Sequence, residues 1–237
     1  MPRYHTALFD ADNTLFDFDR AEEAALTATL AAFGLPDTPA VRARYLELNR
    51  TLWARLDRGE VTREWLVVER FAALLRELDR PGDPARVNRF YLERLGEGAF
   101  LLPGAEELIR ALAGRCTLAV ITNGVALAQR GRFFRSPLAS LIPHLFISEE
   151  VGASKPSPDF FRPVLAALGL TDLRGVLVVG DNLTADIGGG AAVGLDTAWY
   201  NPAHLPAGPV RPTWEVDRLE QLLPLILGPE DGPAYGN

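Results

Sequence analysis

Two carboxylates separated by one residue follow a short apolar run near the start of the chain. The run is Thr6–Phe9, and the carboxylates belong to Asp10 and Asp12. One carboxylate of such a pair can attack phosphorus and coordinate a metal ion, while the other protonates the leaving oxygen and then activates water. The same residues are also typical of an Asx-rich turn that does no chemistry, because Asp side chains readily hydrogen-bond to nearby backbone. The pair by itself leaves both interpretations open.

Two further polar groups stand where anion-binding residues are needed. Thr122, Asn123 and Gly124 follow the apolar run Thr117–Ile121, and a hydroxyl with free backbone N–H groups at a strand end can hold phosphate oxygens. Lys155 precedes a predicted helix, and a fixed cation beside an attacking carboxylate would neutralise a phosphate. Taken singly, Thr-Asn-Gly is also a plain turn sequence, and a lone lysine is usually surface charge.

A third acidic group follows the apolar run Val176–Val179. Asp181 would leave its strand close to Asp10 and offer a second carboxylate to Mg²⁺, which prefers oxygen ligands. Asp186, about one helical turn further on, could orient Lys155 or a metal-bound water. It could equally be the N-cap of the next helix.

These residues need a sheet that brings the ends of several strands to one edge. The chain has five short apolar runs of strand length, at Thr6–Phe9, Thr117–Ile121, Leu145–Ile147, Val176–Val179 and Thr197–Tyr200. Helical patterns separate the later runs, so we expect an α/β fold with a three-layer, Rossmann-like parallel sheet. In an open parallel sheet ligands bind at the carboxyl ends of the strands, which is where every polar group described above would lie.

The segment between the first two strands has a different organisation. It contains four amphipathic helical stretches, at Ala21–Phe33, Ala40–Leu56, Arg63–Leu78 and Pro84–Leu95. A crossover between parallel strands needs only about a dozen residues, so about eighty are too many for a connection. We therefore expect an inserted all-helical domain at residues 18–95, within a catalytic core formed by residues 1–17 and 96–237.

The composition of the chain limits the classes of molecule that we expect it to bind. The net charge of −7 argues against a general affinity for nucleic acid, and no apolar run approaches the roughly 20 residues of a membrane span. The single cysteine, Cys116, suits a reducing cytoplasm and sits in an apolar run typical of core packing. The Pro- and Gly-rich tail at residues 228–237 is expected to be frayed. We expect a cytoplasmic protein, monomeric or homodimeric, whose partner is a small molecule.

Taken together, the motifs resemble the signature set of the haloacid dehalogenase superfamily. That set comprises DxDx[TV], a strand-end Ser or Thr, a Lys and GDxxx(x)D, and the S-E-x-V-G-x-x-K-P pattern at residues 148–156 strengthens the likeness. The resemblance implies that Asp10 is the nucleophile and Asp12 the general acid and base. It implies Mg²⁺ bound by Asp10, the backbone carbonyl of Asp12 and Asp181, and it makes the helical insertion a cap domain that closes over the substrate. The implied phosphoryl-binding residues are Thr122, Asn123 and Lys155. Asp186 and Asn182 are implied to orient the binding residues without contacting the phosphoryl group themselves.

Within that superfamily the residues favour phosphate-ester hydrolysis. Dehalogenases lack a residue equivalent to Asp12, and phosphonatases need a cap lysine, which is missing between Phe16 and Pro103. A phosphomutase of the β-phosphoglucomutase type shares the core motifs and stays open, as does a sugar-phosphate phosphatase. A non-catalytic binding module would be expected to break at least one motif, and none is broken.

At finer grain the chain is similar to the pyrimidine nucleotide 5′-nucleotidase branch, in residues 13–22 and 186–202. We therefore expect a small phosphomonoester as substrate, specifically a nucleoside 5′-monophosphate. The candidate cap residues for nucleoside contact are Asn49, Arg50, Trp53 and Trp65. Tryptophans at helical spacing are more often core residues, so both interpretations stay open for them. Two departures are Asn182, where relatives often carry a smaller polar residue, and Gly131, which is expected to shorten the helix after the second motif.

Overall fold

The computed structural model describes residues 2–228, and the chain divides into two compact units. One unit comprises Met1–Asp19 and Ala99–Asn237, and the other comprises Arg20–Gly98. These boundaries lie within three residues of those expected from the sequence. Most of the tail expected to be frayed, residues 229–237, falls outside the described residues.

The first unit contains a sheet of six parallel strands in the order β3-β2-β1-β4-β5-β6. The strands are β1 Thr6–Phe9, β2 Thr117–Thr122, β3 His144–Ile147, β4 Val176–Gly180, β5 Asp196–Tyr200 and β6 Trp214–Val216. All five predicted strands are present, while β6 was missed because three residues give no periodic pattern. Strand order reverses between β1 and β4, so their carboxyl ends form the crevice where doubly wound sheets bind ligands.

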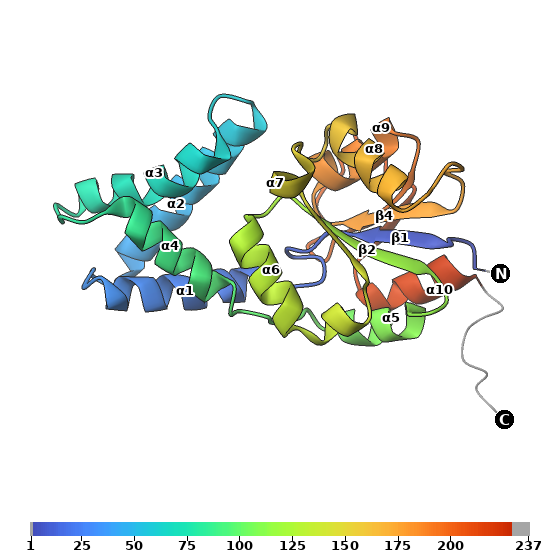
Figure 1. Ribbon diagram of the computed structural model, residues 1–237, viewed down its shortest axis with the longest axis horizontal. Coiled ribbons are helices and arrows are strands. Elements are labelled where there is room, and N and C mark those ends of the chain that lie inside the picture. The colour runs from blue at the N-terminus through green and yellow to red at the C-terminus, as the bar shows by residue number, and fades with distance from the viewer. Residues whose placement is uncertain (1, 229–237) are drawn as a thin grey trace. The chain divides into compact units, whose positions relative to one another are not determined.

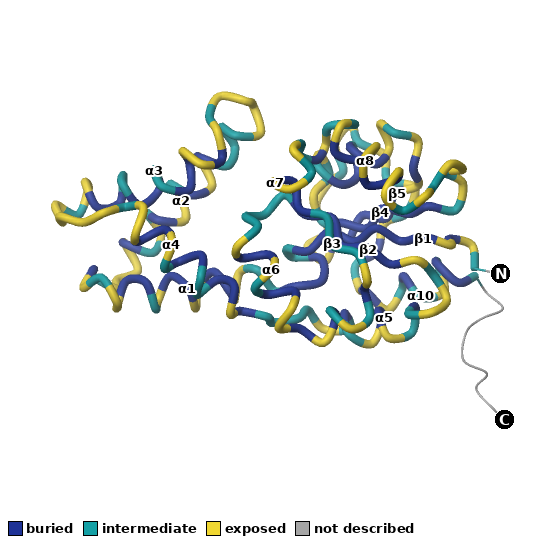
Figure 2. Tube along the Cα trace, viewed as in Figure 1, coloured by how far each residue is buried: buried dark blue, intermediate teal, exposed yellow. Residues whose placement is uncertain are grey.

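The central strands of the sheet are buried (Figure 2), and their successive side chains belong to different apolar clusters. In β1, Ala7 and Phe9 join one apolar cluster while Leu8 joins the other, and in β4 Leu177 and Val178 divide in the same way. This pattern explains why the strands are continuously apolar rather than alternating, as expected for a parallel sheet covered on both sides.

Helices that follow the helical insertion in the chain cover the two faces (Figure 1). Helices α5 (Ala105–Leu112) and α10 (Leu222–Leu227) pack on one face, and α8 (Pro158–Ala167) packs on the other. The predicted helix at residues 185–193 is divided into a π-helix at Leu183–Gly188 and a short α9 at Gly189–Ala192. The expected three-layer α/β architecture is therefore confirmed.

Helix α6 (Ala126–Arg135) corrects one expectation. Gly131 was expected to shorten it, but the helix continues through Gly131 for all ten residues. A glycine inside a helix costs only about 1 kcal/mol, and the adjacent Arg132 and Phe133 are buried and hold that turn. The remaining short elements of this unit are α7 (Ser148–Val151) and two 3₁₀ turns at Pro137–Ser140 and Leu219–Gln221.

The second unit is built from helices. They are α1 (Phe18–Ala32, which starts in the first unit), α2 (Pro39–Asp57), α3 (Arg63–Glu77) and α4 (Pro84–Leu95). Three helices begin at side-chain caps, from Thr38, Thr62 and Asp83, each of which accepts a hydrogen bond from a backbone N–H of the first turn. Within residues 2–228 we find no helix with the length and apolar character needed to cross a membrane.

A buried polar network crosses the middle of this helical unit. Arg70 is 3% exposed and donates to the Oδ1 atoms of Asn49 and Asn88, both at 2.9 Å. Glu22, also buried, accepts from Asn49 Nδ2 at 3.0 Å and from the Tyr91 hydroxyl at 3.3 Å. The Arg70 guanidinium also lies 4.6 Å from the centre of the Tyr91 ring. The network satisfies a buried charge of each sign, so its members depend on one another.

Replacing Arg70 by alanine should therefore destabilise the protein by about 3 kcal/mol, because it removes the buried donors to Asn49 and Asn88 and opens a cavity. Urea unfolding followed by circular dichroism measures this change. Arg89→Ala is the matched control, since Arg89 is exposed and pairs with Glu93 at the surface, so it should cost less than about 0.5 kcal/mol. Equal losses in the two variants would contradict the proposed importance of the network.

Candidate active site

Asp10 lies at the carboxyl end of β1, beside the point where strand order reverses. Its backbone N–H donates to Val179 O at 2.8 Å, which continues the β1–β4 ladder by one residue and fixes the direction of the side chain. Asp10 is buried, so its carboxylate enters a site with little solvent. A charged group in such a place needs a partner.

Lys155 is that partner. Its Nζ lies 2.6 Å from Asp10 Oδ1, 2.6 Å from Asp186 Oδ1 and 2.8 Å from Ile121 O, so all three N–H groups have an acceptor. Burial alone lowers the pKa of Lys155, but the charges of Asp10 and Asp186 outweigh that effect and raise its pKa above the ordinary value. The lysine is therefore a permanent cation whose side chain is only 1% exposed.

The backbone of Lys155 is held by Asn123. Asn123 Oδ1 accepts from Lys155 N at 2.9 Å, and Asn123 Nδ2 donates to Lys155 O at 2.8 Å. Both functions of the Asn123 amide are thus used to position the lysine. Thr122 ends β2, and its Oγ1 accepts from Gly124 N at 3.0 Å, which shapes the turn after the strand.

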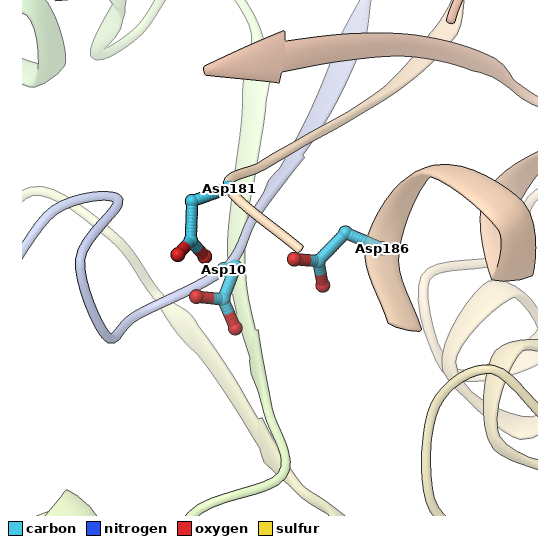
Figure 3. Close-up of side chains that lie close together, drawn as sticks. All are labelled: Asp10, Asp181 and Asp186. Atoms are coloured by element: carbon cyan, nitrogen blue, oxygen red, sulfur yellow. The ribbon is translucent and has the colours of Figure 1, made fainter. Parts of the chain in front are cut away.

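Asp181 follows β4 and is oriented by groups from two other segments. Thr14 Oγ1 accepts from Asp181 N at 3.1 Å, and Trp199 Nε1 donates to Asp181 O at 2.9 Å. Figure 3 shows the carboxylates of Asp10, Asp181 and Asp186 directed toward a common space, and each offers an oxygen within 4.8 Å of the others. The sequence placed Asp10 and Asp181 on neighbouring strand ends, and the structure brings them together.

The electrostatics of these carboxylates show an excess of negative charge. Burial is the main cause that raises the pKa of Asp10 well above its ordinary value, with the Lys155 charge opposing it. The pKa of Asp181 is raised to about 7, first by burial and then by the negative charge of Asp186. A cation placed between Asp10 and Asp181 would relieve this cost, and oxygen donors of this kind suit Mg²⁺.

Asp186 contacts Lys155 and the backbone of the turn after β4. Its Oδ1 accepts from Lys155, its Oδ2 accepts from Asn182 N at 3.1 Å, and its side chain is 1% exposed. Gly180 makes room for it, because a Cβ at Gly180 would lie 2.3 Å from the Asp186 carboxyl carbon. The alternative of Asp186 as helix N-cap is wrong, since Asn182 Oδ1 accepts from Thr184 N and Ala185 N.

Asp12 points to a different environment from that of Asp10. Its Oδ2 accepts from Gln129 Nε2 at 2.8 Å, and its Oδ1 forms an ion pair with Arg132. Both partners come from α6, three residues apart and so on one helical face. They were not predicted because both lie outside the four motifs, and helical spacing alone does not show which residues reach Asp12. The available signal was the helical spacing that joins Gln129 and Arg132 to the buried Phe133.

The four cap candidates have different surroundings. Asn49 is buried and occupied by the network with Glu22 and Arg70, and Trp53 Nε1 donates to Asn49 Oδ1 at 3.1 Å. Arg50 is exposed. Trp65 is 43% exposed, with the Arg55 guanidinium 5.4 Å from its ring centre, so it is not a core residue.

Several known proteins are similar to this chain over nearly its whole length. A model of the haloacid dehalogenase-like hydrolase family matches residues 4–194. HAD-hydrolase YfnB of Bacillus subtilis is 38% identical over 95% of this chain and 97% of its own. A crystal structure of YfnB bound to magnesium superposes with a TM-score of 0.89, at 38% identity, covering 94% of this chain and 98% of that one.

Two further relatives have named activities. Pyrimidine 5′-nucleotidase PynA of Streptococcus pneumoniae is 36% identical over 93% of this chain and 94% of its own. Pyrimidine 5′-nucleotidase YjjG of Escherichia coli is 34% identical over 92% of this chain and 96% of its own. With the family model covering most of the chain and the site residues gathered at one sheet edge, the chain belongs to the haloacid dehalogenase-like hydrolase family.

Proposed function

We propose that this protein hydrolyses a small phosphomonoester through a phosphorylated Asp10. The observation that supports this most strongly is the contact of the Asp10 carboxylate with the buried ammonium of Lys155, beside Asp181 at the carboxyl edge of the sheet. Two negative groups, a carboxylate and a phosphate dianion, must approach one another for attack. A fixed, desolvated cation at 2.6 Å from the nucleophile lowers that repulsion.

In the first step an Asp10 carboxylate oxygen attacks phosphorus, and the bond from phosphorus to the ester oxygen breaks. The electron pair of that bond stays on the ester oxygen, which takes a proton from the Asp12 carboxyl and leaves as an alcohol. Lys155 and the turn after β2, with Thr122 and the backbone of Asn123, hold the phosphoryl oxygens. The side-chain amide of Asn123 contributes by holding Lys155 in place.

In the second step water attacks the same phosphorus, and the Asp12 carboxylate takes its proton. The bond from phosphorus to Asp10 breaks, phosphate leaves, and both aspartates return to their starting states. The net reaction consumes one water and yields one alcohol and one phosphate, so no further reactant is needed. Asp186 keeps Lys155 directed at the site throughout, and Asn182 caps the helical turn that carries Asp186.

The residues present fit a magnesium ion, because the site gathers carboxylate oxygens within 4.8 Å of one another, and burial is the main cause that raises the pKa values of Asp10 and Asp181. Asp10, Asp181 and the backbone carbonyl of Asp12 would hold it. A bound Mg²⁺ supplies charge neutralisation for the phosphoryl group and the carboxylates. The crystal structure of YfnB, the relative described above, is bound to magnesium, which supports this assignment.

For the substrate we propose a nucleoside 5′-monophosphate, with pyrimidines preferred. The support is the likeness of the chain, over more than 90% of its length, to two relatives named as pyrimidine 5′-nucleotidases. In the helical unit, Arg50 and Trp65 are the candidates with exposed side chains, whereas Asn49 and Trp53 are joined to each other. A cytoplasmic location and a monomeric or homodimeric state stay predictions.

Asp10→Asn should lower phosphate release from p-nitrophenyl phosphate with Mg²⁺ by at least about a thousand-fold, because an amide is a far weaker nucleophile. The initial rate of p-nitrophenol formation is the measurement. Asp172→Asn is the control, since Asp172 is an exposed carboxylate paired with Arg174, and it should leave the rate unchanged. Full activity of Asp10→Asn would refute covalent catalysis by this residue.

Metal-free protein should lose stability as pH rises from about 4 to 8. The pKa of Asp181 is raised to about 7 from an ordinary value near 4, so the folded state binds this proton more tightly than the unfolded state does. The resulting stabilisation is complete below about pH 4 and disappears as pH passes the folded-state value. Thermal unfolding in chelator should show a steeper decline for the wild type than for Asp181→Asn.

Added Mg²⁺ should restore wild-type stability at pH 8 and have a much smaller effect on Asp181→Asn. Parallel pH profiles for the two proteins would show that this carboxylate does not carry the strained charge. The variant is thus the matched control for both the pH and the metal measurement.

A phosphate-release screen tests the substrate. UMP, dUMP and dTMP should be hydrolysed with kcat/KM at least about ten-fold above AMP and GMP, which corresponds to about 1.4 kcal/mol of preferential binding in the transition state. Failure on every pyrimidine nucleotide, with sugar phosphates accepted, would replace the nucleotidase by a sugar-phosphate phosphatase. Isomerisation of a sugar phosphate without net phosphate release would replace it by a phosphomutase.

A further inference from the structure

Both oxygens of the Asp12 carboxylate are occupied by donors from α6. Gln129 Nε2 donates to Oδ2 at 2.8 Å, and Arg132 forms the ion pair with Oδ1. The Asp12 side chain is 28% exposed, so one side of the carboxylate still faces solvent. Two donors on two different oxygens fix the rotation of a carboxylate as well as its position, which a single contact does not do.

The arrangement depends on further features of the core. The Arg132 guanidinium lies 5.6 Å from the ring centre of Phe16, in the loop that carries Asp12, and 5.5 Å from that of Phe18, the first residue of α1. A Cβ at Gly124 would lie 1.9 Å from Gln129 Nε2, so only glycine leaves room for that amide. Gln129 is 3% exposed and Arg132 is 1% exposed. These side chains are therefore confined to the conformations that reach Asp12.

The burial of Arg132 is not explained by stability. In the described part of the chain its Nε and Nη1 atoms are buried and have no hydrogen-bond acceptor. A buried guanidinium with one ion pair usually costs as much in desolvation as the pair returns, and an apolar side chain of similar size is often neutral or better. The Arg132 side chain therefore contributes little to folding stability, but it orients the Asp12 carboxylate.

We propose that Arg132 and Gln129 are positioning residues for the second half of the reaction, in which Asp12 takes a proton from the attacking water. Both are pure donors toward Asp12, and they therefore hold the carboxylate that accepts this proton. The inference rests on the proposed function, since it assumes that Asp10 is phosphorylated and that Asp12 activates the water that releases it. It adds two residues of α6 to the site, and neither lies in the four sequence motifs.

The test separates the two steps with p-nitrophenyl phosphate, whose leaving group needs little help from an acid. With this substrate kcat/KM reports on phosphorylation of Asp10, while slowing of hydrolysis lowers kcat and KM together. In Arg132→Met we expect kcat to fall about ten-fold or more, within the range of a general base, while kcat/KM changes less than about three-fold. The fraction of protein carrying phosphate after rapid acid quench of a ³²P-labelled substrate should rise accordingly.

Gln129→Leu should shift the same quantities in the same direction by a smaller factor, and it serves if Arg132→Met does not fold. Arg130→Met is the matched control, because Arg130 lies on the same helix, is exposed, and pairs with Glu150 rather than with Asp12. Its kcat, KM and phosphorylated fraction should equal those of the wild type. The thermal midpoint of Arg132→Met should be unchanged or higher.

Equal falls of kcat and kcat/KM in Arg132→Met and Gln129→Leu, with no rise in the phosphorylated fraction, would overturn the proposal and leave these residues with a structural function. Unchanged kinetics in both variants would overturn it as well. Failure of the proposed function looks different, because the wild type itself would then carry no phosphate on Asp10 after quenching.

Discussion

The site depends on one buried cation that is shared by two carboxylates. Lys155 donates to Asp10 and to Asp186, each at 2.6 Å, and its third N–H reaches a backbone carbonyl at the end of β2. Removing Lys155 would leave the carboxylates of Asp10 and Asp186 buried without their shared cation, which is costly. The triad therefore fixes Asp10, the end of β2 and the helical turn after β4 relative to one another. The room for Asp186 at Gly180 and the Asn123 hold on the Lys155 backbone both serve this one arrangement.

The two aspartates of the first motif are suited to different tasks because their surroundings differ. Asp10 is buried beside the ammonium of Lys155 and other carboxylates, and burial is the main cause that raises its pKa above the ordinary value. Asp12 is partly exposed and held through both oxygens by Gln129 and Arg132. The Asp10 side chain thus lies against the buried ammonium of Lys155, whereas the Asp12 side chain is held by α6 and stays partly open to solvent. Proximity of two carboxylates in sequence is not enough; the separation arises because α6 approaches one of them and Lys155 the other.

Much of this arrangement was predictable because it follows from strand direction. Parallel strands place every strand-end residue at one edge, so Asp10, Lys155 and Asp181 could be gathered from apolar runs and the motifs after them. The features that could not be predicted depend on which side chains meet across the fold. The continuation of α6 through Gly131, the use of the Asn123 amide on Lys155 and the ion pair of Arg132 are decided by packing, which periodicity does not contain. Asn49 is a similar case: it was a candidate for nucleoside contact, but its side chain lies in a buried network with Glu22 and Arg70.

Arg132 illustrates how a site can take precedence over local stability. The helix that carries it includes a glycine one residue earlier, which weakens the helix, and the guanidinium is buried with two of its nitrogens lacking acceptors. Neither feature is what folding alone would favour. The glycine and the buried guanidinium are both acceptable if this position must supply a donor that reaches Asp12 from α6. Arginine suits that requirement because it is long enough and keeps its charge when buried. The cost in stability is then compensated by the large apolar core of the sheet, and the orientation of Asp12 is what this part of α6 contributes.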